Sequence, residues 1–519
     1  MTISKDFWEN IQITDKDLED IYSFLLETES PLDKFEITKL LIQQKISEQE
    51  NILLIEASEA GDHYLPEKTY SENDVLVFPA KDSSKGRVVS VRKGINPDYP
   101  DLQVIEVEMI TGVHVSFASN LKAHKLNNPL PAEKNYLLDS THIYNEFGQV
   151  ISEKVSLALE NNPDLVCIAR QYFPRALLFD IGIGPLNLCE AVLEMAGGGP
   201  FSTTELMTQI DLPISNNSKL TEFSLNFALE EDGRFDEVGP AGITLWFLKR
   251  LEPKEVQNPP FTLEFSGHIP ETPESIHGLN ELNRMVDDEL EQIIPDLRSD
   301  EMTISLSYPH WRAGTLPLTD RNKDIFPTAY ETPRVKFEFN DTSSHTKFSG
   351  WVVRPNKYIY GLKDWYTQQG VFPGSFVTVK KSPTPGEVIV QTAKNKNSRD
   401  WIRTVLIGAD GGIVFALLKQ VISCTYDERM AIMIPDVSSL DQIWASNKFK
   451  QPIEKVILII MREIGKLNLQ NQIHAQELYS AVNIIRRTPP SVILSVLHSQ
   501  PWATHLGDLY FKLEENAAP

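Results

Sequence analysis

Two short helices are predicted at the start of the chain. Apolar residues recur there at spacings of three and four, as at Leu18, Ile21, Tyr22 and Leu25, and a Ser-Pro step interrupts the run. This spacing places the apolar side chains on one face of each helix. Residues 1–65 are therefore expected to form a helical domain of helix-turn-helix type.

Between residues 72 and 121, apolar and polar residues alternate in place of the helical spacing. Apolar pairs such as Val75 and Val77, or Val89 and Val91, lie in short runs that Gly, Pro, Asn and Asp separate. Alternation with a period of two predicts strands, and the separating residues predict tight turns. Four or five such strands are typical of a small SH3-like or KOW-like β-barrel, which we expect in residues 66–130. Barrels of this size bind RNA, peptides or proteins, so the fold alone selects no ligand.

Helical spacing returns after the predicted barrel. One helical run ends at three glycines, a second begins at Ser202 or Thr203 with Glu205 nearby, and a third follows a polar turn. The chain then continues into a polar hairpin and the apolar run "LWFL". Three helices and a hairpin predict a winged helix in residues 140–253, and Trp246 is expected to close its small core.

The end of the chain repeats this order. Helices are predicted at 474–485 and 490–499, and "WATHLGDLYFKL" reads as a wing with Tyr510 in place of the tryptophan. We therefore predict a second winged helix in residues 438–519. The N-terminal helical pair is a candidate for a third, but no third helix or wing is recognisable in "EQENILLIEASEAGDHYL".

The middle of the chain has a different composition. Residues 254–300 read as a Pro-rich and then acidic connector with one helix near 282–293. Residues 301–437 alternate like strands, with Gly411 and Gly412 in a hairpin turn, and form a β-rich domain that is net basic. The predicted fold class is therefore α+β and multidomain, with repeated winged helices, a small SH3-like β-barrel and a larger β-rich domain.

The third helix and wing of the winged helix predicted in residues 140–253 resemble a known family. The stretch "LNFALEEDGRFDEVGPAGITLWFLK" is similar to the HARE-HTH winged-helix domain of the delta subunit of bacterial RNA polymerase, over about residues 186–252. The resemblance implies a winged-helix fold and a role beside RNA polymerase, and "GPAGIT" is an insertion relative to the delta wing. The matching positions are Asp232, Gly233, Arg234, Phe235, Gly239 and Trp246.

A second, shorter resemblance lies in the β-rich domain. The segment "LKDWYTQQGVFPGSFVTVKK" is similar to a helix and strand of B3-type pseudobarrel DNA-binding domains, although Ser375 stands where that family has an acidic residue. It implies a pseudobarrel in residues 301–435 that binds DNA.

Charge is distributed unevenly along the chain. The formal net charge is −23, from 72 acidic and 49 basic residues. Residues 334–429 carry 14 basic and 8 acidic side chains, whereas the first 333 residues carry 27 basic and 56 acidic ones. Phosphate contacts need concentrated Lys and Arg, so only the second half is expected to contact a polyanion. The acidic first half is expected to dock on a protein partner.

The apolar runs and the cysteines indicate the cellular compartment. No apolar run reaches the ~18 residues of a membrane span, and no basic region followed by an apolar core begins the chain. Three cysteines, Cys167, Cys189 and Cys424, lie far apart in apolar surroundings, as reduced buried thiols do. We expect a cytoplasmic protein that does not associate with membranes.

Basic residues near aromatic ones are the candidates for nucleic-acid contact, because cations bind phosphates and rings stack on bases. Trp351 and Trp401 lie among them in the β-rich domain, and two arginines precede the last predicted helix. The alternative is a solvated surface with two core tryptophans and structural salt bridges. The candidates are Arg354, Lys357, Lys380, Lys381, Lys394, Lys396, Arg399, Arg403, Arg486 and Arg487.

The third helix of the winged helix predicted in residues 140–253 is acidic, which argues against contact with nucleic acid there. It carries Glu222, Glu230 and Glu231 against Lys219, so we expect a protein-binding or structural role there.

Signatures of catalysis are missing from the sequence. It contains no HExxH, CxxC, Walker or GxGxxG motif, so no catalytic residue, metal site or small-molecule cofactor is expected. His310, Trp311 and Arg312 form either an exposed functional cluster or a structured loop.

These observations favour a non-enzymatic, multi-domain regulatory or adaptor protein that acts in transcription or another DNA transaction. RNA polymerase or another nucleic-acid-processing complex would be its protein partner, with DNA as a possible second ligand. The alternatives are a protein-protein interaction scaffold without nucleic-acid binding and an effector of a defence system, including a nuclease without a local signature.

Overall fold

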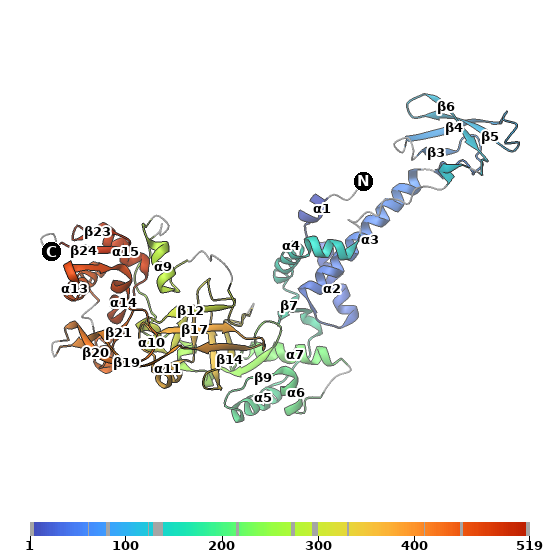
Figure 1. The fold of residues 1–519 in the computed structure, drawn as a ribbon. Helices are drawn as coiled ribbons and strands as arrows, with labels where there is room; N and C mark the ends of the chain where they lie inside the picture. Colours follow the sequence, from blue (N-terminus) through green and yellow to red (C-terminus); the bar gives the residue numbers. More distant parts are fainter. Residues whose placement is uncertain are drawn as a thin grey trace. The chain divides into compact units, whose positions relative to one another are not determined.

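The computed structural model contains several helical and β-sheet modules (Figure 1). Contacts divide the chain into two compact units, Met1–Phe179 with Ser215–Phe223 and Asp180–Ile214 with Ser224–Pro519. The architecture is mixed α+β. The structure describes residues 5–60, 62–78, 84–122, 124–127, 139–213, 217–270, 276–292, 299–329, 332–408, 411–446 and 450–514.

The first helical module is assembled from two separate parts of the sequence. Ile21 and Leu41 pack in one core with Ile143, Phe147 and Tyr172, which lie about a hundred residues later. The predicted domain boundary at residue 140 is therefore wrong, because the apolar residues of 143–172 complete the N-terminal core and only the later part of 140–253 forms the next core. The elements are α1 (Lys5–Glu9), α2 (Asp15–Thr28), β1 (Leu32–Asp33), α3 (Lys34–Ala60), α4 (Ser140–Glu160), β7 (Leu165–Ile168) and β8 (Gln171–Pro174).

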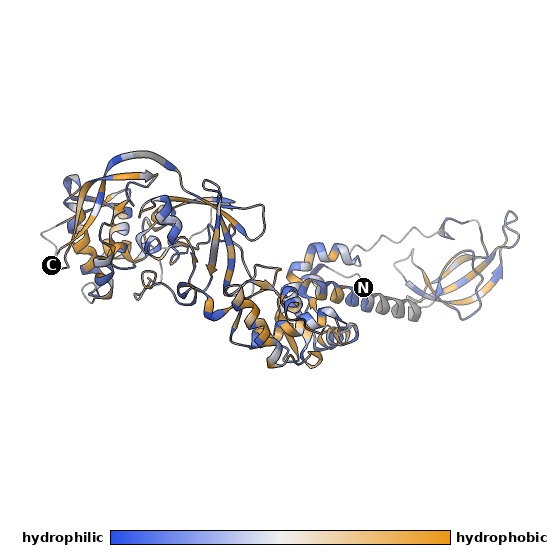
Figure 2. Ribbon diagram, turned by 90° about the horizontal axis from the view of Figure 1, so that it is seen from below, coloured by the Kyte–Doolittle hydropathy of each residue, from blue (hydrophilic) through white to orange (hydrophobic). Residues whose placement is uncertain are grey.

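A five-stranded sheet lies between α3 and α4 in the sequence. Its strands pair in chain order, and Leu76, Ile105 and Val107 form a core of their own with packed aromatic rings. Hydrophobic and hydrophilic residues alternate along these strands, as Figure 2 shows. The strands are β2 (Asp62–His63), β3 (Val75–Phe78), β4 (Ser84–Lys93), β5 (Gln103–Met109) and β6 (His114–Ser119).

The second helical module contains the "LWFL" run as its last strand. Trp246 is 2% exposed and packs with residues of all three helices, and its Nε1 donates to Thr203 Oγ1 at 3.1 Å and to Asn226 Oδ1 at 3.0 Å. The aromatic ring therefore closes this core, as predicted. The elements are α5 (Ile183–Met195), β9 (Phe201–Ser202), α6 (Thr203–Gln209), α7 (Ser218–Glu231), β10 (Phe235–Glu237) and β11 (Leu245–Leu248).

The third helical module ends the described chain. Its helices pack around Phe511, which is 1% exposed. The elements are α13 (Ile453–Gly465), β22 (Gln472–His474), α14 (Ala475–Ile485), α15 (Pro490–Ser499), β23 (Ala503–Gly507) and β24 (Tyr510–Leu513).

The three helical modules share one order of elements and one sheet topology. In each, a short strand follows the first helix and pairs antiparallel with the last strand of the hairpin. The residue that ends this short strand caps the second helix, and a glutamate three residues later bonds back to the cap. These pairs are Asp33 with Glu36, Ser202 with Glu205, and His474 with Glu477.

The same register identifies equivalent aromatic residues. The residue before each cap lies opposite a buried ring in the hairpin: Leu32 opposite Tyr172, Phe201 opposite Trp246, and Ile473 opposite Phe511. The prediction that Tyr510 replaces the tryptophan is therefore off by one position. Because neighbouring strand residues point to opposite faces, Phe511 rather than Tyr510 faces the core.

The predicted acidic connector is not a solvated linker. Its helix α9 (Leu279–Val286) packs on the third helical module, and the acidic residues after it, Asp287, Asp288, Glu289 and Glu291, are all less than 8% exposed. A short helix α8 (Lys254–Gln257) precedes it.

The β-rich region holds a sheet of seven strands around one core. All seven contribute buried apolar residues to that core, which also includes Trp365 and Tyr366 of a short helix. The strand order is β12-β17-β18-β14-β15-β16-β13, with β14 and β18 parallel. The elements are β12 (Glu301–Ser305), α10 (Tyr308–Ala313), β13 (Thr315–Pro317), β14 (Arg334–Asp341), β15 (Thr346–Val353), β16 (Tyr358–Tyr360), α11 (Lys363–Gln369), β17 (Phe376–Lys381) and β18 (Glu387–Gln391).

A long hairpin follows this sheet. β19 (Lys394–Ile407) and β20 (Ile413–Cys424) are antiparallel, with Gly411 and Gly412 in the turn as predicted. β19 also pairs with β21 (Ile432–Met433), and α12 (Val437–Ala445) leads to the third helical module. Within the described ranges, no helix combines the length and the apolar character that crossing a membrane requires.

Candidate functional site

Five of the basic candidates have exposed side chains. Lys380 lies 3.4 Å from Glu301 in a half-exposed ion pair, which contributes little to stability. Lys394 and Arg399 have no ion pair within the described ranges. The side chain of Lys396 lies outside the described residues. The exposed candidates are Lys357, Lys380, Lys381, Lys394 and Arg399.

One cavity of about 850 Å³ collects part of this set. Arg354, Lys357 and Lys381 line it, and the Arg354 guanidinium donates to the carbonyls of Ala329 and Thr332. Six carboxylates line it as well, so its charge does not favour an anion. They are Glu289, Glu291, Asp300, Asp320, Asp324 and Glu387.

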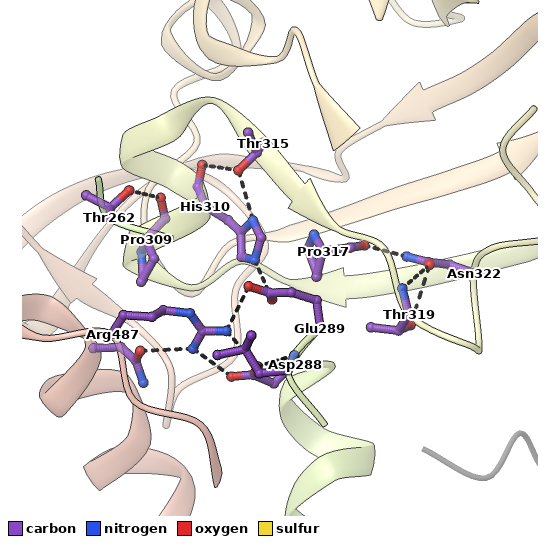
Figure 3. A network of polar contacts seen from close by, with 12 residues as sticks. Thr262, Asp288, Glu289, Pro309, His310, Thr315, Pro317, Thr319, Asn322 and Arg487 are labelled. Carbon is purple, nitrogen blue, oxygen red and sulfur yellow. Dashed lines mark hydrogen bonds and ion pairs between the residues drawn. The ribbon is translucent and has the colours of Figure 1, made fainter. Parts of the chain in front are cut away.

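Arg487 lies in the protein interior and is not available for phosphate contact. Its guanidinium donates to Asp288 at 2.6 and 2.8 Å and to Glu289 at 2.9 Å, and all three side chains are at most 3% exposed. Tyr479 also donates to Asp288, at 2.7 Å. Figure 3 shows this network extending from Glu289 to His310 and Thr315.

The network balances buried charges. Burial alone would raise the pKa of Glu289, but the Arg487 guanidinium and His310 outweigh it and hold that pKa below its ordinary range. Removing one partner of such a network leaves an uncompensated buried charge, at a cost of about 3–5 kcal/mol. The network therefore ties α14 and the segment after α9 to α10.

His310, Trp311 and Arg312 do not form an exposed cluster. Trp311 Nε1 donates to the carbonyl of Val371 at 2.8 Å, and Arg312 makes two hydrogen bonds to Asp441, at 2.6 and 3.0 Å. These contacts bind the β-rich region to α12, so the cluster corresponds to the structured loop.

Arg403 is also buried, at 7% exposure. It pairs with Glu477 at 3.1 Å and donates to the carbonyls of Glu428 and Arg429. It lines a groove of about 730 Å³ between the β19–β20 hairpin and the third helical module. Arg486 donates to the carbonyl of Gln451 at 2.7 Å and is half-buried.

The two tryptophans of the β-rich region differ in environment. Trp351 is 3% exposed and packs edge to face on Phe247. Trp401 is 66% exposed on β19, two residues from Arg399 and directly opposite Lys419 of β20. Only Trp401 has an aromatic face available to a ligand.

The third helix of each helical module presents little basic surface. Most of α15 is buried, from Pro490 to Leu494, and α7 buries seven of its side chains. α4 has an open face, but it carries Glu146, Glu153 and Glu160. A helix of this kind would be repelled by DNA phosphates.

A buried carboxyl group lies beside the second helical module. Burial, followed by the nearby Asp236, raises the pKa of Glu252 to about 8, although Arg334 lies 3.5 Å away. Burial thus favours the protonated form of Glu252. Asp236 takes the closer contact with Arg334, at 2.9 Å.

Over the ranges that the structure covers, no group of three or more His, Cys, Asp or Glu side chains is placed to hold a metal ion. His277, His498 and His505 pack ring to ring at centroid distances of 5.4–6.1 Å without forming such a group.

Sequence reasoning missed the carboxylates of the buried network and the caps at Asp33 and His474. The acidic run after α9 gave no sign of its partner, because Arg487 is 199 residues away from Asp288. The caps had a signal: "LDKFEI", "FSTTEL" and "IHAQEL" share an apolar residue, a capping residue and a glutamate three positions later. No family model matches the chain, and no similar curated protein or solved structure was found.

Proposed function

We propose that this chain is a non-enzymatic, multi-domain adaptor that acts in transcription or another DNA transaction. In this proposal its three helical modules are winged helices, its five-stranded sheet is an SH3-like barrel and its seven-stranded sheet is a pseudobarrel. The observation that carries it is the threefold recurrence of one element order, with the first strand beside the last and a capped second helix. A helix-turn-helix unit closed by a hairpin is what a winged helix requires, and helix-turn-helix units serve regulators of DNA transactions, so this recurrence supports the proposal.

The winged helices serve protein contacts in this proposal. A DNA-reading winged helix needs an exposed third helix that is not acidic, because its side chains must enter a groove lined by phosphates. Here α15 and α7 are largely buried and α4 is acidic. The acidic first half would dock on a basic protein surface, such as one on RNA polymerase.

Nucleic-acid contact is assigned to exposed basic residues of the β-rich region. Lys394 and Arg399 lie on one strand, and neither is neutralised by a carboxylate of the described chain. Such contacts position a duplex without reading its sequence.

Salt-dependent binding of the full chain to duplex DNA tests this function. We expect measurable binding at about 50 mM salt and a steep loss of affinity by about 200 mM, since counterions are released from each contacted phosphate. The variant Lys394→Gln/Arg399→Gln should bind several-fold more weakly and show a smaller salt slope. Lys5→Gln/Lys16→Gln removes the same charge from the first helical module and should leave binding unchanged.

A second candidate is a protein-protein scaffold without nucleic-acid affinity. The acidic face of α4 and the net charge of −23 favour it. Absence of any duplex binding at about 50 mM salt would select the scaffold and exclude the first proposal. Recovery of polymerase subunits with the purified chain would support the transcription role in either case.

A further inference from the structure

The outer edge of β20 is open. β20 is the end strand of the sheet β20-β19-β21, and within the described ranges no strand pairs with its other side. It is twelve residues long and contains no proline. A long edge strand is a template for another strand, and natural proteins protect such edges with charge, bulges or cover.

The hydrogen-bond register shows which backbone groups face outward. At the turn, the amide of Gly408 donates to the carbonyl of Gly412 at 2.8 Å, and the pairing continues without a shift to Ser398. In an antiparallel ladder, hydrogen-bonded and non-hydrogen-bonded pairs alternate. The odd-numbered residues of β20, among them Leu417, Lys419 and Val421, therefore direct their N–H and C=O groups away from β19.

The side chains of these same residues form an apolar and cationic surface. Val421 is 59% exposed, Leu417 is 43% exposed, and both share a face with Trp401, which is 66% exposed. Lys419 and Arg399 lie on that face, are exposed and have no ion pair within the described ranges. Leu418, on the other face, is also 36% exposed, whereas Leu417 and Trp401 line the groove toward Leu467 and Tyr510 of the third helical module.

These features determine the chemistry of an occupant. Alternating free donors and acceptors match the backbone of an extended polypeptide, and a nucleic acid has no such alternation. The unpaired Lys419 and Arg399 favour carboxylates, whereas Trp401 and Val421 favour apolar side chains. If a second copy of the chain paired with β20, Lys419 and Arg399 of the two copies would lie close together, and their like charges would repel.

We propose that β20 binds an acidic, strand-forming segment of a partner protein by β-strand addition. The segment continues the sheet outward from β20, with apolar residues on Trp401, Leu417 and Val421 and carboxylates on Lys419 and Arg399. This inference assigns a partner chemistry to the adaptor role and does not depend on DNA binding.

The probe is a fluorescent peptide of about ten residues in which every second residue is threonine and the residues between them are alternately valine and glutamate. One face of the extended peptide then presents valines to Leu417 and Val421 and a glutamate to Lys419. We expect the full chain to bind it, and Leu417→Pro to weaken binding about tenfold, since proline removes one outward N–H. The matched control, Leu417→Thr, loses the same leucine but keeps the N–H and should bind several-fold more tightly than the proline variant. The same peptide with lysine in place of each glutamate should not bind.

A measurement on the unmodified chain avoids any folding defect of the proline variant. Peptide binding should slow amide exchange at Phe415, Leu417, Lys419 and Val421, and leave the amides of Ala416 and Leu418, already bonded to β19, unchanged. Equal binding by the two Leu417 variants, or uniform protection of all these amides, would overturn the proposal. So would a dimer of the free chain that Leu417→Pro dissociates. The peptide titration contains no nucleic acid. Its outcome therefore tests the strand-addition proposal alone, and the duplex-binding experiment tests the proposed function separately.

Discussion

Arg487 and Arg399 have the same side chain and opposite environments. Arg487 is fully buried among Asp288, Glu289 and Tyr479, whereas Arg399 is exposed and unpaired within the described ranges. A buried charge depends on its partners, because the interior cannot solvate either ion alone.

We predict that Arg487→Met destabilises the protein by about 3–5 kcal/mol, because two carboxylates then lose their buried counter-ion. Arg399→Met should change stability by about 0.5 kcal/mol or less. Urea denaturation followed by circular dichroism measures both. Adding Asp288→Asn to Arg487→Met should recover part of the loss, since the sites interact directly. Equal unfolding midpoints for the two single variants would contradict a charge-balancing role.

At the scale of elements, local patterns predicted local structure. The apolar spacing and end residues of α14 and α15, the hairpin at Trp246 and the turn at Gly411 could be read from the sequence, because short-range rules specify them. The completion of the first helical module by α4 could not, because the five-stranded sheet separates its halves along the chain. The burial of the acidic run after α9 likewise depends on a distant arginine. Lys394 and Arg399 were found by composition, but only geometry separates them from the buried Arg403 and Arg487.

The register predicts that Trp246 and Phe511 have the same role in different modules. Replacing either by Ala should cost about 3–5 kcal/mol and reduce amide protection mainly within its own module, because each ring fills a small core. Tyr510→Ala should cost less, since Tyr510 lies on the other face of β24 and is only half-buried. Hydrogen exchange with site resolution measures all three. A larger effect of Tyr510→Ala than of Phe511→Ala would show that the modules are not aligned as the strand pairing indicates.

At the scale of the whole molecule, the first unit is a helical module interrupted by an inserted sheet. The helical core takes its residues from Trp8 to Ile46 and from Ile143 to Tyr172, and the sheet has a separate core around Ile105 and Val107. Two cores that share no residue are expected to fold independently. The long insertion also adds loop-closure entropy that the helical core must overcome, although this cost grows slowly with length.

We therefore predict that replacing residues 62–138 with a flexible Gly/Ser linker preserves the helical core. Amides of α2 and α4 should keep their protection in hydrogen exchange, and the helical circular dichroism of the remaining chain should be retained. Phe147→Ala is the control, because it deletes a buried ring of that core and should cost about 3–5 kcal/mol. If the deletion removed protection from α2 as completely as Phe147→Ala does, the inserted sheet would be part of the folding unit. If protection persists, the sheet is a separable module that can be exchanged or removed without disturbing the helices that carry it.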